Sequence, residues 1–235
     1  LKDHTLSGAE ALTRWIQEDG KMVYPNSFIR LFEKNGFCAE LDLYMFEKVC
    51  IQLRMWIDAG YEPAPISINQ SKITFYRENY MQELRSILDR YKISASLIIL
   101  EILEGLAIDN IAEMNKRLRE LKKIGFQISM DDFGTGYSSL NTFAKLEIDE
   151  VKLDRGFLME AAGPDGQKTQ LIMEGVVKLA EKLSISTVIE GIETEDDEQL
   201  AIQIGCSQGQ GYFYGCPVEA DVFTKEILIK YLTEK

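Results

Sequence analysis

The sequence has little of several residue types on which common functional sites depend. Its 235 residues include one histidine, four cysteines and five prolines. Lysine and arginine together number 26, fewer than the 38 aspartates and glutamates. A single histidine, His4, excludes a histidine-rich metal centre and a Ser-His-Asp triad. The cysteines lie far apart and form no CxxC pair, so neither a disulfide framework nor a zinc site is indicated.

Long hydrophobic runs are also missing. No stretch of about 18 apolar residues and no signal-peptide pattern occurs, so we expect a cytoplasmic protein, or the cytoplasmic domain of a membrane protein, without membrane contact from this segment. The net charge of −12 opposes binding to nucleic acid polymers, which requires clustered lysine and arginine. If the substrate is a phosphate ester, its charge must be neutralised otherwise, for example by divalent metal held by carboxylates.

Short apolar or β-branched runs recur along the chain, and helical patterns follow them. The predicted strands lie at about 5–11, 65–69, 97–102, 126–131, 149–154, 186–191 and 209–214. This alternation predicts an α/β fold in which helices cover a parallel sheet, either open or closed into a barrel. We predict one domain over residues 1–235, excised from a larger protein. Because a barrel usually has eight strands, we expect the first one to be absent or truncated.

Polar residues gather where the predicted strands end. They are Glu10, Asn69, Glu101 with Glu104, Asp131 with Asp132, Lys152 with Asp154, and Glu190 with Glu193. In a parallel barrel these positions converge on the rim at the carboxyl ends of the strands. Clustered carboxylates would repel one another unless cations lay between them. Oxygen ligands without histidine or thiolate favour Mg²⁺ or Mn²⁺ over zinc.

Each of these acids could instead be a solvated loop residue or a helix N-cap. That alternative is weakest for Asp131 and Asp132, which follow the apolar run FQISM and precede the glycine-containing loop GTGYSSL. For Lys152, strand alternation sets it on the face opposite Val151 and Leu153. Because an inward lysine needs partners and the acids of the rim supply them, we expect Lys152 to point inward as a buried cation, although an outward lysine is the alternative.

The order of these motifs resembles the EAL domain family. Its Glu-Ala-Leu signature is found at Glu10-Ala11-Leu12, and six further matches follow in order: SINQS at 67–71, LEILEG at 100–105, DDFGTGYSSL at 131–140, VKLDR at 151–155, IEGIE at 189–193 and QGYFYGCP at 210–217. A three-residue signature alone has almost no specificity. The ordered set is specific, and it runs from Gly8 to about Pro217.

The resemblance implies a TIM-like barrel that acts as a metal-dependent phosphodiesterase and hydrolyses cyclic di-GMP to linear 5'-pGpG. It implies two Mg²⁺ or Mn²⁺ ions, one held by Glu10, Asn69, Glu101 and Asp131, and one reached by Asp131, Asp132 and Glu190. Lys152 would contact the attacking water between the ions. Glu190 is also a candidate general base, and the choice between its two roles stays open.

The resemblance assigns roles to four more residues. Glu104 would orient the DFGTG loop, Arg14 would pair with a substrate phosphate, and Asp154 and Gln210 would help to bind substrate. A homodimer and an upstream sensory or GGDEF domain are also implied. The chain departs from the family at Ala9 and Thr13, where an aromatic residue and Leu or Val are usual, and in lacking a first-strand Gln that helps to bind substrate.

Two other functions remain open. The domain could be a catalytically silent or regulated receptor for cyclic di-GMP. It could also be a metal-dependent barrel lyase or aldolase acting on phosphorylated sugars, since such enzymes also have carboxylates and a lysine at the rim. The sugar-phosphate alternative explains DDFGTGYSSL and SINQS less well.

Overall fold

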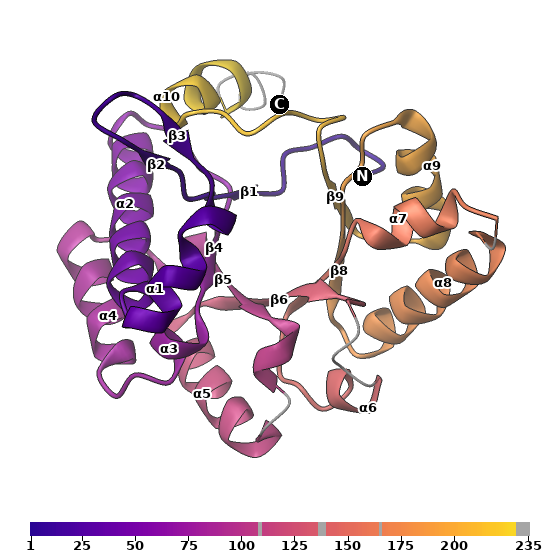
Figure 1. Ribbon diagram of the computed structural model, residues 1–235, viewed down its shortest axis with the longest axis horizontal. Coiled ribbons are helices and arrows are strands. Elements are labelled where there is room, and N and C mark those ends of the chain that lie inside the picture. Colours follow the sequence, from indigo (N-terminus) through magenta and orange to yellow (C-terminus); the bar gives the residue numbers. More distant parts are fainter. Residues whose placement is uncertain (108–109, 136–139, 165, 229–235) are drawn as a thin grey trace. The chain divides into compact units, whose positions relative to one another are not determined.

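The computed structural model describes residues 1–107, 110–135, 140–164 and 166–228. Residues 136–139 of the DDFGTGYSSL motif therefore lie outside the described residues. Figure 1 draws the chain, which divides into two compact units. The Asn69 unit comprises Gly8–Glu101, Ile124–Phe126 and the part of the chain from Ala220 onward, and the Asp131 unit comprises Leu1–Ser7, Ile102–Lys123 and Gln127–Glu219.

The strands of the Asn69 unit are β1 (Ala9–Glu10), β4 (Ile66–Gln70) and the first residues of β5 (Ile98–Leu103). β1 pairs in parallel with β4, with Glu10 opposite Ser67. The predicted strand at 5–11 is thus wrong in length, because only two of its residues pair. A two-stranded antiparallel hairpin that the sequence did not predict follows, formed by β2 (Trp15–Ile16) and β3 (Met22–Val23).

In the Asn69 unit, α2 is the helix against which α1, α3 and α4 lie. They are η1 (Pro25–Ser27), α1 (Ile29–Asn35), α2 (Cys38–Asp58), α3 (Lys72–Phe75), α4 (Tyr80–Tyr91), η2 (Ala95–Leu97), α10 (Ala220–Phe223) and η4 (Thr224–Leu228). α2 buries Phe46, Val49, Cys50, Leu53 and Trp56, whose spacing places them on one apolar face of the helix. α2 and α4 pack side by side (Figure 1).

The Asp131 unit has four parallel strands in the order β6 (Gln127–Phe133), β7 (Glu150–Leu153), β8 (Ser186–Glu190) and β9 (Gln208–Gln210). Its helices are η3 (Glu104–Ala107), α5 (Ile111–Ile124), α6 (Leu140–Phe143), α7 (Gly156–Ala161), α8 (Gly166–Lys182) and α9 (Glu195–Ile204). The strand predicted at 209–214 ends at Gln210, because the next residues fold back and the Phe213 N–H donates to the carbonyl oxygen of Ile192.

The interior of the Asp131 unit explains why its strands read as nearly continuous apolar runs. Ile128, Met130, Val151, Leu153 and Ile189 are all buried, as expected for strands covered on both faces. In the strand register, Lys152 lies opposite Val188 and Glu190 lies opposite Gln210. The ladder between β6 and β7 is irregular between Met130 and Phe133, where the two acids of the DD pair lie.

Burial governs the chemistry of three of the four cysteine thiols. All four cysteines are free, and burial raises the pKa of Cys38 to about 11 and that of Cys50 and Cys206 to about 12, so these thiols stay protonated.

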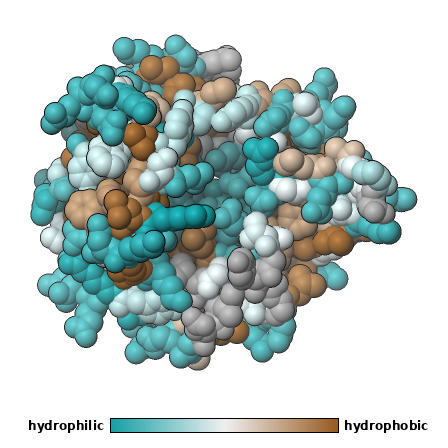
Figure 2. Space-filling model, viewed as in Figure 1, coloured by the Kyte–Doolittle hydropathy of each residue, from teal (hydrophilic) through white to brown (hydrophobic). Residues whose placement is uncertain are grey.

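Among the described helices, none combines the length and apolar character needed to cross a bilayer. Apolar surface is present in the Asn69 unit where α1 lies, including Leu31 and Phe37 (Figure 2).

Candidate active site

The carboxyl end of β6 carries two adjacent aspartates, and the backbone of the second is strained. Asp132 has φ +58°, a left-handed conformation that is uncommon for a non-glycine residue, and its N–H donates to Asp131 Oδ1 at 3.0 Å. Gly134 follows with φ +107°, and any side chain there would clash with the ring of Phe157. Strain of this kind persists only where the surroundings hold it, and it is typical of functional sites.

Glu104 fixes the turn that follows these aspartates. Its side chain extends from η3 and is buried, and Oε2 accepts a hydrogen bond from the Gly134 N–H at 3.2 Å. The family resemblance implies that Glu104 orients this loop, and that role stays a prediction. A carboxylate held in this place restrains the loop backbone directly beyond Asp131 and Asp132.

Lys152 is the buried cation that strand alternation predicts. Its side chain is 2% exposed, and Nζ lies 2.7 Å from Glu190 Oε1 and 3.4 Å from Asp131 Oδ1. The three residues come from the neighbouring strands β6, β7 and β8, and Glu190 lies two residues beyond Val188, the residue opposite Lys152. Since an isolated buried ammonium group is very costly, the two carboxylates compensate a charge that the fold places between them.

Asp131, Asp132 and Glu190 form a potential metal site. Each offers a carboxylate oxygen, and these oxygens lie within 4.8 Å of one another. The donors are all hard oxygens, so the set fits Mg²⁺ or Mn²⁺ better than zinc or copper. The strained backbone of Asp132 and the close spacing of three negative groups are both consistent with a cation at this position.

Two predicted substrate-binding residues border this cluster within the Asp131 unit. Gln210 ends β9 opposite Glu190 in the parallel ladder. Asp154 directly follows β7, and its Oδ1 accepts the N–H of Gly156 at 2.8 Å, a contact that starts α7. This contact gives Asp154 a structural role at the helix start, and its role in substrate binding stays a prediction.

In the Asn69 unit the structure brings together Glu10 and Asn69. They lie on the paired strands β1 and β4, and Asn69 Nδ2 donates to Glu10 Oε1 at 2.9 Å. Glu101 lies in β5 and is 1% exposed.

Arg14 donates from Nη1 to the Thr13 carbonyl oxygen at 2.7 Å, and its guanidinium lies over the Tyr24 ring, 5.2 Å from the centroid. Stacking restrains the planar guanidinium group while its other N–H groups can still bind an anion.

Sequence reasoning missed two polar residues that support these groups. Glu150 is buried beside Lys152 on β7, burial raises its pKa, and Gln208 Nε2 approaches its Oε2 at 3.4 Å. Strand alternation could have revealed it, because Glu150 and Lys152 are two residues apart and share a face. Asp42 of α2 contacts the segment after Asn69, and no local pattern pointed to it.

Parallel strands alternating with helices, with polar side chains gathered where the strands end, are typical of α/β barrel proteins. The profile of the EAL domain family matches residues 1–217. The chain therefore belongs to the EAL domain family, which confirms the family predicted from its motifs.

Relatives and solved structures agree with this placement. The chain is 34% identical over 214 residues to the bifunctional diguanylate cyclase/cyclic di-GMP phosphodiesterase MucR of Pseudomonas aeruginosa, covering 91% of this chain and 31% of MucR. It is 32% identical to the cyclic di-GMP phosphodiesterase NbdA of the same organism, covering 93% of this chain and 28% of NbdA. The chain thus spans about a third of the length of these curated relatives.

The solved phosphodiesterase domain of MucR in complex with c-di-GMP gives a TM-score of 0.84 at 33% identity, covering 90% of this chain and 85% of that one. This likeness confirms the predicted fold class, a TIM-like α/β barrel fold. The site roles assigned to individual residues, and the prediction of a single domain over residues 1–235, stay predictions.

Proposed function

We propose that this domain hydrolyses cyclic di-GMP to linear 5'-pGpG with the help of Mg²⁺ or Mn²⁺. The observation that carries the proposal is the cluster of Asp131, Asp132 and Glu190 against buried Lys152, in a chain of the EAL family. A receptor that only binds the nucleotide would not need a costly buried ammonium group among carboxylates. The relatives named as cyclic di-GMP phosphodiesterases support the choice of substrate.

The ligand set follows from the donor chemistry and from the family resemblance. Asp131, Asp132 and Glu190 would hold one ion, and the resemblance assigns Glu10, Asn69 and Glu101, with Asp131, to another. Bound divalent ions supply Lewis acidity, which lowers the pKa of an attacking water and stabilises charge on the phosphodiester.

The side chains orient the substrate and the attacking water, and they transfer protons. Lys152 keeps Asp131 and Glu190 in place and donates a hydrogen bond to the attacking water. Glu190 is either a metal ligand or the base that takes the proton from this water. Arg14 binds a phosphate of the substrate, Gln210 and Asp154 position it, and Glu104 keeps the loop after Asp132 in shape.

Product analysis tests the proposal directly. Purified domain mixed with cyclic di-GMP and Mn²⁺ or Mg²⁺ should yield 5'-pGpG, identified by chromatography and mass spectrometry. Because the carboxylates need divalent ions to act, EDTA should abolish turnover and added Mn²⁺ should restore it. Nucleotide binding without product would favour a silent receptor, and turnover of a sugar phosphate instead of cyclic di-GMP would favour a barrel lyase or aldolase.

We also propose that the domain forms a homodimer, acts in the cytoplasm and belongs to a longer protein with a sensory or GGDEF domain, as the family resemblance implies. Exposed apolar side chains on α8, at Leu171 and Ile172, are candidates for the dimer contact. Light scattering should then give about twice the monomer mass of 26.8 kDa. A double replacement of Leu171 and Ile172 by Glu should give a monomer if α8 forms the contact, and a dimer that survives it would place the contact elsewhere.

A further inference from the structure

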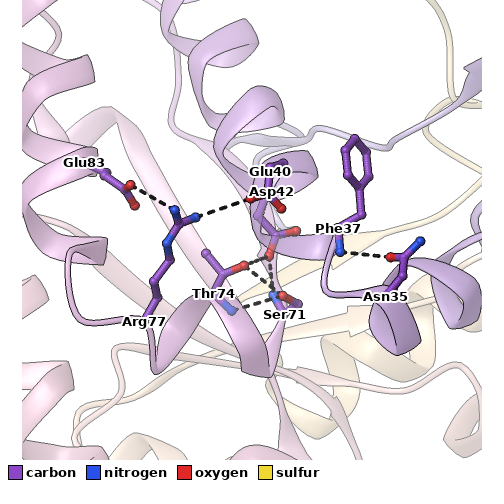
Figure 3. Close-up of polar contacts among 8 residues, drawn as sticks. All are labelled: Asn35, Phe37, Glu40, Asp42, Ser71, Thr74, Arg77 and Glu83. Carbon is purple, nitrogen blue, oxygen red and sulfur yellow. Dashed lines mark hydrogen bonds and ion pairs between the residues drawn. The ribbon is translucent and has the colours of Figure 1, made fainter.

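Asp42 connects helix α2 to the segment that follows Asn69. Its Oδ2 accepts hydrogen bonds from the Ser71 N–H at 2.9 Å and from the Thr74 hydroxyl at 2.6 Å, as Figure 3 shows. The Ser71 hydroxyl also lies 2.9 Å from the Thr74 hydroxyl and accepts the Thr74 N–H at 3.4 Å, which caps α3. One carboxylate oxygen of Asp42 therefore binds both Ser71 and Thr74, the two residues that form the capping turn at the start of α3.

The position of Ser71 gives this contact its importance. β4 ends at Gln70 and α3 begins at Lys72, so Ser71 lies in the junction between the strand and the helix. Its N–H is bound by a side chain from α2, 29 residues earlier in the chain. Without that acceptor, the backbone two residues beyond Asn69 would lose its anchor and could turn differently.

A second anchor holds the peptide group between Asn69 and Gln70. Gln70 Nε2 donates to the Asn69 carbonyl oxygen at 2.8 Å, and the Tyr80 hydroxyl donates to Gln70 Oε1 at 2.7 Å. Gln70 and Tyr80 are both buried. Asn69 is thus followed by two peptide groups that side chains fix, and its own side chain donates to Glu10 at 2.9 Å.

Nearby ion pairs do not replace Asp42. Arg77 lies 3.9 Å from Glu40 and 3.5 Å from Glu83, and all three side chains are partly or largely exposed (Figure 3). Such pairs contribute little and restrain geometry weakly. Burial raises the pKa of Asp42, so the fold keeps a carboxyl where it is costly, and the hydrogen bonds that it accepts offset that cost.

We propose that Asp42 is a positioning residue for the reaction: by holding the Ser71 N–H, it fixes the end of β4 so that the Asn69 side chain meets Glu10. The effect on turnover rests on the proposed function, whereas the effect on Asn69 does not. Supporting residues of this kind commonly change metal affinity or activity by about 10- to 100-fold when removed.

Asp42→Ala tests the proposal, with Thr74→Val as the matched control. Thr74→Val removes the hydroxyl contact to Asp42 but leaves the Ser71 N–H bound. We expect Asp42→Ala to weaken Mn²⁺ binding about 10-fold in calorimetry, to lower kcat at limiting Mn²⁺, and to recover kcat in excess Mn²⁺ with little change in KM for cyclic di-GMP. Thr74→Val should lower thermal stability and leave Mn²⁺ affinity within about twofold, because the anchor persists.

A readout in metal-free protein separates this inference from the proposed function. In NMR spectra the side-chain amide protons of Asn69 should shift in Asp42→Ala and not in Thr74→Val, whether or not the domain hydrolyses cyclic di-GMP. If Asp42→Ala does not fold, Asp42→Asn keeps one acceptor oxygen and should show the same shift to a smaller extent. Unchanged Asn69 signals, or equal Mn²⁺ affinity in Asp42→Ala and Thr74→Val, would overturn the positioning role. A wild-type domain that yields no pGpG would instead overturn the proposed function.

Discussion

Replacement of Asp131 by Asn is expected to lower the rate of cyclic di-GMP hydrolysis by at least about 10³-fold, equivalent to roughly 4 kcal/mol of transition-state stabilisation. Asp131 combines three interactions: it belongs to the carboxylate cluster, lies 3.4 Å from Lys152 Nζ, and accepts the Asp132 N–H. Asn keeps an oxygen that can accept the backbone hydrogen bond. It removes the negative charge, which supplies the strongest electrostatic attraction for a divalent ion at this position.

The fold should survive this change. Glu190, at 2.7 Å, still compensates the Lys152 ammonium group in Asp131→Asn, and the loss of one negative charge relieves repulsion within the carboxylate cluster, so the thermal midpoint in metal-free buffer should change little. Initial rates with saturating Mn²⁺ and the melting curve together measure the effect. Asp196→Asn, an exposed residue in the first turn of α9, is the matched control and should retain full activity.

The proposed role of Asp131 would be contradicted by an Asp131→Asn variant that keeps more than about a tenth of the wild-type rate, because loss of a metal ligand costs far more than this. Glu10→Ala extends the test to the Asn69 unit. As a proposed ligand, Glu10 should also be required for turnover, and its removal leaves Asn69 without its hydrogen-bond partner.

The central strands of the Asp131 unit were predictable because their side chains obey one simple constraint. A strand covered on both faces must be apolar, as Met130, Val151 and Ile189 show, so polar residues stand out where the strand ends. Lys152 is the clearest example: alternation separated it from Val151 and Leu153, the nearby acids favoured the inward face, and the structure has its side chain 2% exposed. These features are local, and a single sequence contains them.

The remaining features depend on contacts between distant segments. The hairpin of Trp15–Ile16 and Met22–Val23 has strands of two residues, too short to show a period. The strand ending at Gln210 was overextended because YFY suits a strand, whereas the Phe213 N–H bonds to the Ile192 carbonyl oxygen instead. Asp42 near the start of a helix reads as a solvated or dipole-stabilising acid, and only its partner 29 residues later shows otherwise.

Replacement of Lys152 by Met should affect both turnover and stability. The change keeps an unbranched side chain of similar length, and it removes the ammonium group that lies 2.7 Å from Glu190 and 3.4 Å from Asp131. Both carboxylates then face each other with no cation between them. Breaking a buried ion pair on one side costs about 3–5 kcal/mol, and loss of a proton-handling group costs about 10²-fold or more in rate.

The coupling of stability to metal distinguishes this explanation from simple loss of packing. Without Lys152, divalent ions become the main source of positive charge for Asp131, Asp132 and Glu190, so Mn²⁺ should raise the melting temperature of Lys152→Met more than that of the wild type. Lys122→Met is the matched control, since Lys122 forms an ion pair with Asp149 at 2.6 Å on side chains that are each about a third exposed. Such a pair contributes at most about 1 kcal/mol, and its loss should change neither turnover nor the response to Mn²⁺. If both lysine variants gave the same melting shift with Mn²⁺, the buried ammonium group would not be the charge that holds this carboxylate cluster together.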